Sequence, residues 1–315
     1  MIAMMLTLSM LAASLAGCAG GDDDEDDDWT ITMANDVSVV WVESAWDPII
    51  PNLNAGEMCD VIISAMTKTD VRDLEVDFTS AYYTSTQGVI GGTGVASITD
   101  VSELNATGVK IGLQSGTTSD LYAQDNLVDA TISAFDTFPE AVLALENGDV
   151  QYIMGDAPVL ELEGTLMDTF SDENFGFAVR EDSSELLAAL NVAIAAVIAS
   201  GEYDVIYGNW FSDTNRLADD STADTATVYP TPTEGSTLTS VLESGQLKVC
   251  TDPEYPPFEY KDEDDNIIGF DADMAHAVSD EIAANYMGAA NDASKKTIKI
   301  GVIYDNEADL ANFAP

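Results

Sequence analysis

The sequence predicts an α/β fold in which short buried strands alternate with helices. Two apolar runs, 61–63 and 109–113, have the length and composition of parallel strands that are buried on both faces. Two longer segments, 140–147 and 184–200, have helical periodicity, and each is followed by a glycine that can end a helix. Strands and helices that alternate in this way along a chain are typical of a doubly wound sheet.

The other elements follow the same alternation from residue 37 onward. We expect strands at 37–42, 61–63, 109–113 and 152–154, and helices at 48–54, 119–125, 140–147 and 184–200. A second group follows a stretch rich in Asp, Thr, Ser and Pro: a strand at 247–251, an aromatic proline turn at 254–259, a short strand at 267–270 and a helix at 273–284.

Composition bounds the function. The chain has 315 residues and 46% hydrophobic content, which is enough for a sizeable core. The formal charge of −47 comes from 57 acidic and 10 basic residues and would repel nucleic acid and anionic membrane surfaces. We therefore expect no nucleic-acid partner, and we interpret the acidity as a uniformly solvated surface, as in salt-adapted proteins.

The first residues resemble an export signal. An uncharged apolar run, 1–15, precedes small residues and Cys18, and Leu15-Ala16-Gly17-Cys18 resembles a lipobox, whose cysteine becomes lipidated. An acidic tether would occupy 19–36. These features predict an exported lipoprotein anchored to the extracytoplasmic face of a membrane. Because no basic residue precedes the apolar run, a plain signal peptide or a start further upstream is the alternative.

The remaining cysteines and the one histidine do not suggest chemistry. Cys59 and Cys250 each lie beside a predicted strand, so we expect two buried thiols rather than a disulfide. His276 lies in a helical pattern and is expected to be half-buried, with no nucleophile beside it. We predict no metal site and no cofactor.

Polar residues follow the strand at 61–63. Ser64 and Thr67 come directly before Arg72, at the carboxyl end of a strand, where open α/β sheets bind ligands. Hydroxyls, helix N-terminal amides and a guanidinium could bind a carboxylate there. From these residues alone, a surface ion pair of Arg72 is the more common arrangement.

The blocks along the chain resemble a known family. CDVIISAMTKTDVRDLEVDFTSAYY at 59–83, WDPIIPNLNAGE at 46–57 and LQSGTTSDLY at 113–122 are similar to the polar amino-acid solute-binding proteins of ABC importers. EAVLALENGDV at 140–150, GDAP at 155–158 and SGEYDVIYGNWF at 200–211 continue the resemblance. A last block, LKVCTDPEYPPFEYKDEDDNIIGFDADMAHAV at 247–278, resembles the beginning of the family but stands after its end.

The resemblance implies a two-lobed, type II periplasmic-binding fold with a hinge of two crossing segments, at 86–92 and 175–180. It also implies a polar amino acid as ligand, a membrane ABC permease as partner and no catalysis. Arg72 would bind the ligand carboxylate and Asp156 its ammonium group. The other implied site residues are Thr67, Thr117 and Thr118 beside Arg72, Trp46 and Tyr255 on either side of the ligand side chain, and Asp252 and Ser64 on the floor.

Structural alternatives to these roles remain open. Trp46 could be a core residue, Asp252 a strand-end cap and Thr67 a helix N-cap. The chain departs from the family pattern at Ala65, where many members carry a hydroxyl, and at Gln151, where Asp is common.

The block order allows two domain organisations. In a circular permutation, residues 241–290 supply the first βα unit that the bilobal core, 37–212, lacks, and 213–240 is a linker. In a truncated tandem, 241–290 begins a second copy, and the tail 291–315 resembles the start of a further domain. We favour pairing of 247–251 with the strands near Val39 and Ile62, because a sheet without its central strand would expose apolar edges.

Two other function classes share the fold. A dehydratase acting on prephenate-like acids would need a placed acid, for which Glu254 or Asp252 is available. An extracytoplasmic sensor lobe would need a transmembrane helix and an output domain. We predict a binding protein rather than an enzyme.

Overall fold

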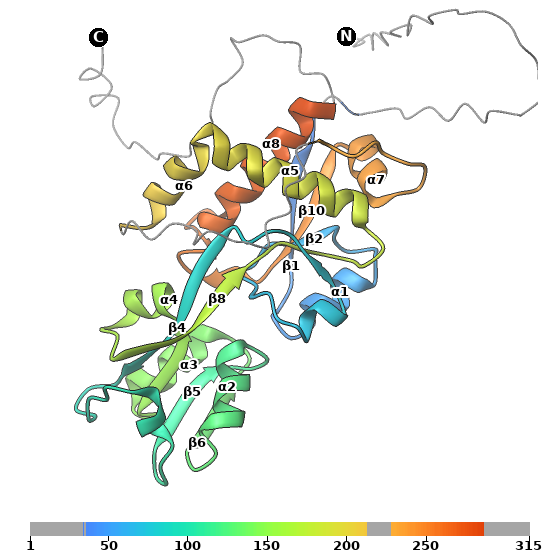
Figure 1. Ribbon diagram of the computed structural model, residues 1–315. Coiled ribbons are helices and arrows are strands. Elements are labelled where there is room, and N and C mark those ends of the chain that lie inside the picture. The colour runs from blue at the N-terminus through green and yellow to red at the C-terminus, as the bar shows by residue number, and fades with distance from the viewer. Residues whose placement is uncertain (1–33, 35, 213–227, 287–315) are drawn as a thin grey trace, which may run out of the picture. The chain divides into compact units, whose positions relative to one another are not determined.

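The computed structural model describes residues 34, 36–212 and 228–286. These residues form two five-stranded sheets and one small three-stranded sheet, with helices between the strands (Figure 1). The predicted α/β class is confirmed. Cys18, the lipobox, most of the acidic tether and the tail 291–315 lie outside the described residues.

The first sheet takes its strands from three separate parts of the chain. Its order is β1-β10-β2-β9-β3, with these bounds: β1 Ser38–Glu43, β10 Gln246–Thr251, β2 Val61–Ile62, β9 Ala178–Val179 and β3 Asp77–Phe78. β10 is parallel to both of its neighbours: Val40 lies opposite Lys248, and Val249 lies opposite Val61. The C-terminal strand therefore lies between β1 and β2, as predicted (Figure 1).

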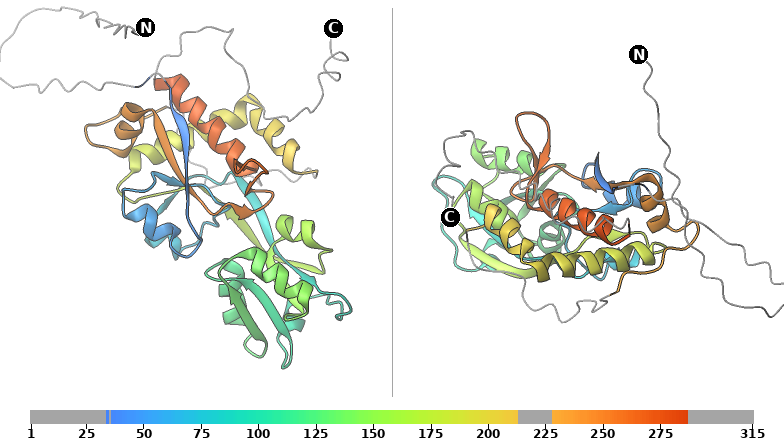
Figure 2. Two further views of the ribbon diagram at one scale, coloured as in Figure 1. Left: turned by 180° about the vertical axis from the view of Figure 1, so that it is seen from behind. Right: turned by 90° about the horizontal axis from the view of Figure 1, so that it is seen from above.

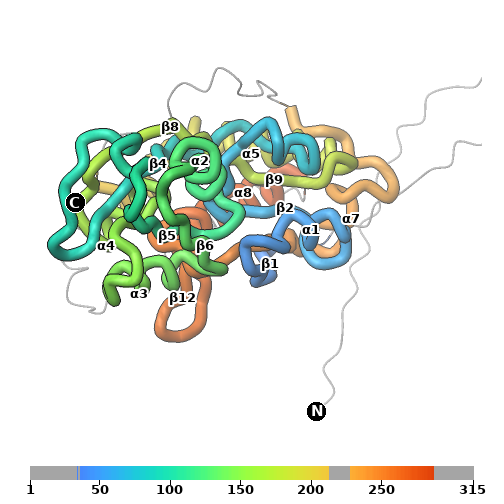
Figure 3. Tube along the Cα trace, turned by 90° about the horizontal axis from the view of Figure 1, so that it is seen from below, coloured from blue at the N-terminus to red at the C-terminus, as the bar shows by residue number. Residues whose placement is uncertain are grey.

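The second sheet comes from one continuous stretch. Its order is β6-β5-β7-β4-β8, with these bounds: β6 Thr131–Phe135, β5 Lys110–Gln114, β7 Tyr152–Asp156, β4 Tyr83–Gly91 and β8 Asp168–Phe175. The first three strands are parallel, and β4 and β8 are antiparallel to their neighbours. The helices α2 (Thr118–Asn126) and α3 (Phe138–Asn147) lie on opposite sides of β5 and β6 (Figure 3), so this sheet is covered on both faces.

The chain crosses twice between the two sheets. It leaves the first sheet after Phe78 and enters the second with β4 at Tyr83, so the first crossing lies a few residues before the predicted segment 86–92. That segment lies in β4 and on its C-terminal side. The return runs from Phe175 at the end of β8 to Ala178 in β9, inside the predicted 175–180. The early crossing has a physical cause, because the Tyr83 ring packs at the crossing against Phe175 and Phe258.

The C-terminal block adds a small sheet and a long helix to the first lobe. The small sheet is antiparallel and consists of β11 Glu254–Tyr255, β12 Glu259–Lys261 and β13 Ile267–Ile268. The helix α8 (Phe270–Tyr286) begins three residues before the predicted 273. His276 in α8 is exposed rather than half-buried, because it lies on the outer face of the helix, where its ring meets Trp41 edge-on at 6.0 Å.

Helices cover both faces of the first sheet. α5 (Ser184–Ser200) and α8 lie side by side (Figure 2), and their apolar residues share a core with Leu247 and Val249 of β10. α1 (Ile49–Asn54) covers the other face together with Cys250. The remaining helices are α4 Ala157–Glu163, α6 Glu202–Trp210 and α7 Thr237–Ser244, with 3-10 turns at Arg72–Leu74 and Val101–Leu104.

No single helix in 36–212 or 228–286 is long and apolar enough to cross a membrane. α5 and α6 reach that length and hydropathy only when taken together, and they meet at an angle of 83°.

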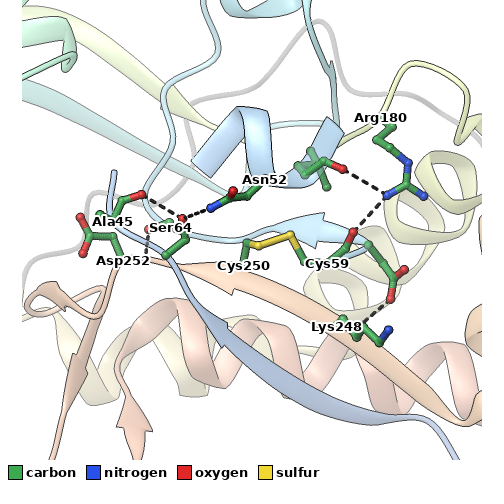
Figure 4. The surroundings of a disulfide bond; sticks show 11 residues. Ala45, Asn52, Cys59, Ser64, Arg180, Lys248, Cys250 and Asp252 are labelled. Atoms are coloured by element: carbon green, nitrogen blue, oxygen red, sulfur yellow. Dashed lines mark hydrogen bonds between the residues drawn. A yellow bond between two sulfur atoms is a disulfide. The ribbon is translucent and has the colours of Figure 1, made fainter. Parts of the chain in front are cut away.

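Cys59 and Cys250 form a disulfide, so the expectation of two separate thiols was wrong (Figure 4). Their Cα atoms are 5.6 Å apart although 191 positions separate them in sequence. The pairing depends on β10 lying beside β2, a neighbourhood that neither cysteine reveals locally. The bond links the C-terminal block covalently to the N-terminal part of the first lobe.

The backbone around this disulfide is held by Arg180. Its guanidinium donates to the carbonyl oxygen of Cys59 at 3.0 Å and to the Thr237 hydroxyl at 3.0 Å (Figure 4 labels Arg180 and Cys59). Arg180, which directly follows β9, thereby connects the end of that strand with the disulfide and with the start of α7.

Candidate functional site

The carboxyl ends of strands from both large sheets meet at one pocket. β10 ends just before Asp252, β2 just before the loop with Ser64, β5 ends at Gln114 and β7 at Asp156. The pocket has an empty volume of about 420 Å³ that includes space open to solvent. This is where parallel α/β sheets hold ligands.

All nine ligand-binding residues expected from the sequence line this pocket. They are Trp46, Ser64, Thr67, Arg72, Thr117, Thr118, Asp156, Asp252 and Tyr255. Asp252 and Tyr255 reach it because β10 is inserted between β1 and β2.

Arg72 is the cation of the pocket lining. It lies at the start of a 3-10 turn, and its guanidinium donates to the carbonyl oxygens of Thr67 at 2.9 Å and Gly116 at 3.3 Å. The guanidinium carbon lies 5.1 Å from the centroid of the Trp46 ring, a cation–π arrangement. Burial lowers the pKa of Arg72 to about 10, while Glu173 and Asp156 act in the opposite direction, so the group stays charged at neutral pH.

Thr117 caps the helix that faces Arg72. Its hydroxyl donates to the Gln114 carbonyl at 2.8 Å and accepts from the Asp120 amide at 3.3 Å. The preceding Gly116 has φ +69°, a conformation that favours glycine, and a Cβ there would come within 3.0 Å of Asp47. This turn brings the N-terminus of α2 to the pocket.

Asp156 and Tyr255 join the two lobes. The Tyr255 hydroxyl donates to the Asp156 carboxylate at 2.7 Å and accepts from the Asp156 amide at 3.2 Å, and Gln87 donates to the same carboxylate at 3.0 Å. Burial is the main cause that raises the pKa of Asp156, to about 7. The ring of Tyr255 packs edge-on against Phe138 at 5.4 Å.

Asp252 forms a second link between the lobes. Its carboxylate accepts from Gln114 at 3.2 Å, and its amide donates to the Ser64 hydroxyl at 3.0 Å (Figure 4 labels Ser64 and Asp252). Burial raises the pKa of Asp252 to about 6. Ser64 in turn donates to Glu259 at 2.8 Å.

Five lining residues were not among the expected ligand-binding residues: Ala65, Gln114, Phe138, Glu254 and Glu259. The sequence could have indicated Gln114, because a polar residue at the end of an apolar strand is a candidate for the pocket lining. Glu259 had none, since in sequence it is one residue of an aromatic turn. It becomes part of the pocket only because the small sheet folds over Ser64.

The pocket lining is acidic overall. Asp156, Asp252, Glu254 and Glu259 line it together with a single cation, Arg72. Such a pocket suits a ligand with one anionic group and more than one cationic group.

Comparisons with known proteins match the chain to solute-binding proteins. The model of the family described as bacterial extracellular solute-binding proteins, family 3, matches residues 30–213 and 247–294. A probable histidine-binding protein of Neisseria gonorrhoeae is 30% identical over 196 residues, which cover 57% of this chain and 70% of that protein. An L-arginine-binding protein of Pseudomonas aeruginosa is 33% identical over 193 residues, covering 56% and 73%.

The chain is also similar to solved structures of amino acid-binding proteins. An ancestral amino acid-binding protein described as a precursor of cyclohexadienyl dehydratase has a TM-score of 0.52 and 34% identity, covering 54% of this chain and 77% of that chain. A variant of the arginine-binding protein of T. maritima has a TM-score of 0.51 and 28% identity, covering 55% and 77%.

Proposed function

Because the chain belongs to the bacterial extracellular solute-binding proteins of family 3, we propose that it binds a polar amino acid in this pocket and delivers it to an ABC importer. One observation carries the proposal: Arg72, positioned from the first lobe, and Asp156, from the second, line the same pocket with opposite charges. An amino-acid zwitterion has a carboxylate that can pair with Arg72 and an ammonium group that can pair with Asp156.

Each end of the zwitterion has a partner in this proposal. Arg72 binds the α-carboxylate, with Thr67, Thr117 and Thr118 beside it, because a guanidinium can donate two parallel hydrogen bonds to a carboxylate. Asp156 binds the α-ammonium, because a nearby positive charge favours the ionised form of this buried carboxyl group.

The side chain of the ligand would extend along the remaining walls. Trp46 and Tyr255 supply aromatic faces, and Asp252 with Ser64 forms the floor. Asp252 and Glu254 line the pocket in addition to the pair Arg72 and Asp156, and these further carboxyl groups support a cationic side chain. Relatives named for arginine and histidine support the same class.

The test is a binding screen with a matched pair of variants. Thermal shift with the twenty amino acids, followed by calorimetry, should select arginine, lysine or histidine, since a ligand at 100 times its dissociation constant stabilises by about 2.7 kcal/mol. Arg72→Ala should weaken binding by about 2–5 kcal/mol, whereas Lys110→Ala, an exposed cation outside the pocket, should leave it unchanged. Full affinity in Arg72→Ala would refute the assignment.

The raised pKa of Asp156 gives a pH signature. The folded pKa of about 7 means that below pH 7 the free protein holds a proton that the ammonium must displace. Affinity should therefore fall as the pH drops from 7 to 5, by up to about tenfold per pH unit. Asp156→Asn should bind weakly at every pH; a pH-independent wild type would exclude Asp156 as the partner.

We propose binding without chemistry. A dehydratase remains the second candidate because Asp252, with its raised pKa, and Glu254 line the pocket and a structural neighbour is described as a dehydratase precursor. Incubation with prephenate distinguishes the two: product formation that Asp252→Asn abolishes would establish an enzyme.

We also propose one bilobal binding unit in permuted order, with 241–290 supplying the first βα unit of the lobe that contains β1 and β2. The insertion of β10 supports this organisation over a truncated tandem.

The family is extracytoplasmic, and we propose that Cys18 anchors this member through a lipid. Cys18→Ser should move the protein from the membrane to the soluble fraction. The absence of a lipid mass on the wild-type protein would contradict the anchor.

A further inference from the structure

Two buried carboxyl groups lie at the pocket floor, where Glu259 lines the pocket and Asp271 does not. Glu259 of β12 is 1% exposed and Asp271, in the first turn of α8, is fully buried. They bind consecutive residues of one loop, since Glu259 accepts from the Ser64 hydroxyl at 2.8 Å and Asp271 from the Ala65 amide at 2.7 Å, and the Asp271 amide donates to the carbonyl oxygen of Phe258 at 2.9 Å. Two ionised carboxylates cannot share such a site without a cation, so a proton must lie between them.

The surrounding donors favour a proton on Glu259 rather than on Asp271. Asp271 accepts from the Ala65 amide at 2.7 Å and from the Tyr82 hydroxyl at 2.8 Å, and it lies at a helix N-terminus, where negative charge is favoured. Glu259 accepts only from Ser64, and its second oxygen, Oε2, has no donor among the described residues. A proton on Oε2 that is donated to Asp271 satisfies every one of these atoms.

No cation opposes this arrangement within the described part of the chain. The other titratable groups that face the pair are Asp252 after β10, Tyr82 before β4 and Tyr255 in β11. Arg72 faces Glu173 and Asp156 instead. Burial, followed by the negative charge of Asp271, raises the pKa of Glu259 well above its usual value.

Each carboxyl group also holds a part of the pocket floor. Glu259 orients the Ser64 hydroxyl, which in turn accepts from the Asp252 amide. Asp271 holds the amide of Ala65, a non-glycine residue at φ +42° that lines the pocket. A left-handed alanine costs energy and persists only where such contacts fix it.

We propose that Glu259 and Asp271 hold one proton between them and act as positioning residues that set the shape of the ligand pocket floor through Ser64 and Ala65. The binding part of this inference rests on the proposed function, whereas the shared proton does not. Neither residue is required to touch the ligand.

Unfolding without ligand tests the shared proton. Glu259 is protonated in the folded state and ionised in the unfolded state above about pH 4.5, so the pair stabilises the fold at low pH and loses that stability as the pH rises through the folded pKa. Glu259→Gln replaces the proton by an amide donor and removes this dependence. We compare the melting temperature of Glu259→Gln with that of wild type at pH 5 and at pH 8.5. The difference, variant minus wild type, should be larger at pH 8.5 than at pH 5 by about 4 °C or more.

Glu243→Gln removes an exposed carboxyl group on α7 and is the control for lost charge. Its melting temperature should change with pH in the same way as that of wild type. A Glu259→Gln curve that also runs parallel to wild type would overturn the shared proton, whatever the protein binds.

A double-mutant cycle with L-arginine tests the positioning role. Glu259→Ala and Ser64→Ala should each weaken binding about tenfold or more. Glu259→Gln should bind more tightly than Glu259→Ala, because its amide oxygen can still accept from the Ser64 hydroxyl. If Glu259 acts through Ser64, the double variant should be no weaker than the worse single variant. Additive losses, or wild-type affinity in Glu259→Ala, would overturn this route.

Discussion

The two lobes each contain a five-stranded sheet, but the chain builds them differently. The second lobe uses one continuous stretch from Tyr83 to Phe175. The first lobe needs strands from three places, and its inner strand β10 arrives from residue 246 onward. The second lobe can therefore form from local information, whereas the first lobe and the pocket it shares depend on the C-terminal block.

The largest test of this contrast is removal of everything after Ser212. The first sheet would lose β10, and both β1 and β2 would expose an unpaired edge, so we expect an aggregation-prone fragment without amino-acid affinity. Hydrogen exchange on the soluble remainder should find protection kept in β5 and β7 and lost in β1 and β2. A soluble truncated chain that binds ligand with two-state unfolding would make the C-terminal block a separate domain.

Loss of the disulfide should have a smaller effect that is confined to one lobe. Cys59→Ala with Cys250→Ala removes a link across 191 positions and should reduce the free energy of unfolding by about 2–5 kcal/mol. Urea unfolding gives the total, and hydrogen exchange should locate the loss in the first lobe. Chemical reduction of the wild-type protein is the control, and an equal loss of protection in both lobes would contradict the contrast.

The smallest test compares one helix cap from each lobe. Ser236 caps α7 in the first lobe and accepts from the Thr239 amide, as Thr117 caps α2 in the second. Alanine at either position should reduce stability by about 0.5–2 kcal/mol. Only Thr117→Ala should also weaken ligand binding, because Thr117 lines the pocket. Equal affinities in the two variants would place Thr117 in a purely structural role.

The sequence predicted the elements that bury apolar runs. β2, β5 and α5 were found close to their expected bounds because each contains a continuous buried apolar pattern. β8 was missed because DTFSDENF has three acidic residues among few apolar ones, in a strand that lies at the edge of the sheet. Polar edge strands give no periodic signal that a single sequence can show.

For the pocket too, the sequence predicted only what has a local pattern. Arg72, Asp156 and Asp252 stand at strand ends or just after them, and their positions follow from the order of strands. The disulfide and the Glu259–Asp271 pair depend on contacts between segments about 190 and 12 residues apart that only the assembled sheets bring together. Chemistry that arises from such contacts has no local sequence pattern.

The position of β10 also fixes when the pocket can exist during synthesis. At about 5–20 residues per second, the 191 positions between Cys59 and Cys250 take roughly 10–40 s to translate. The second lobe is complete at Phe175, well before β10 emerges. Until β10 has been made, β1 and β2 lack the strand that lies between them. The ligand pocket therefore cannot be complete before residues 252–259 have been made.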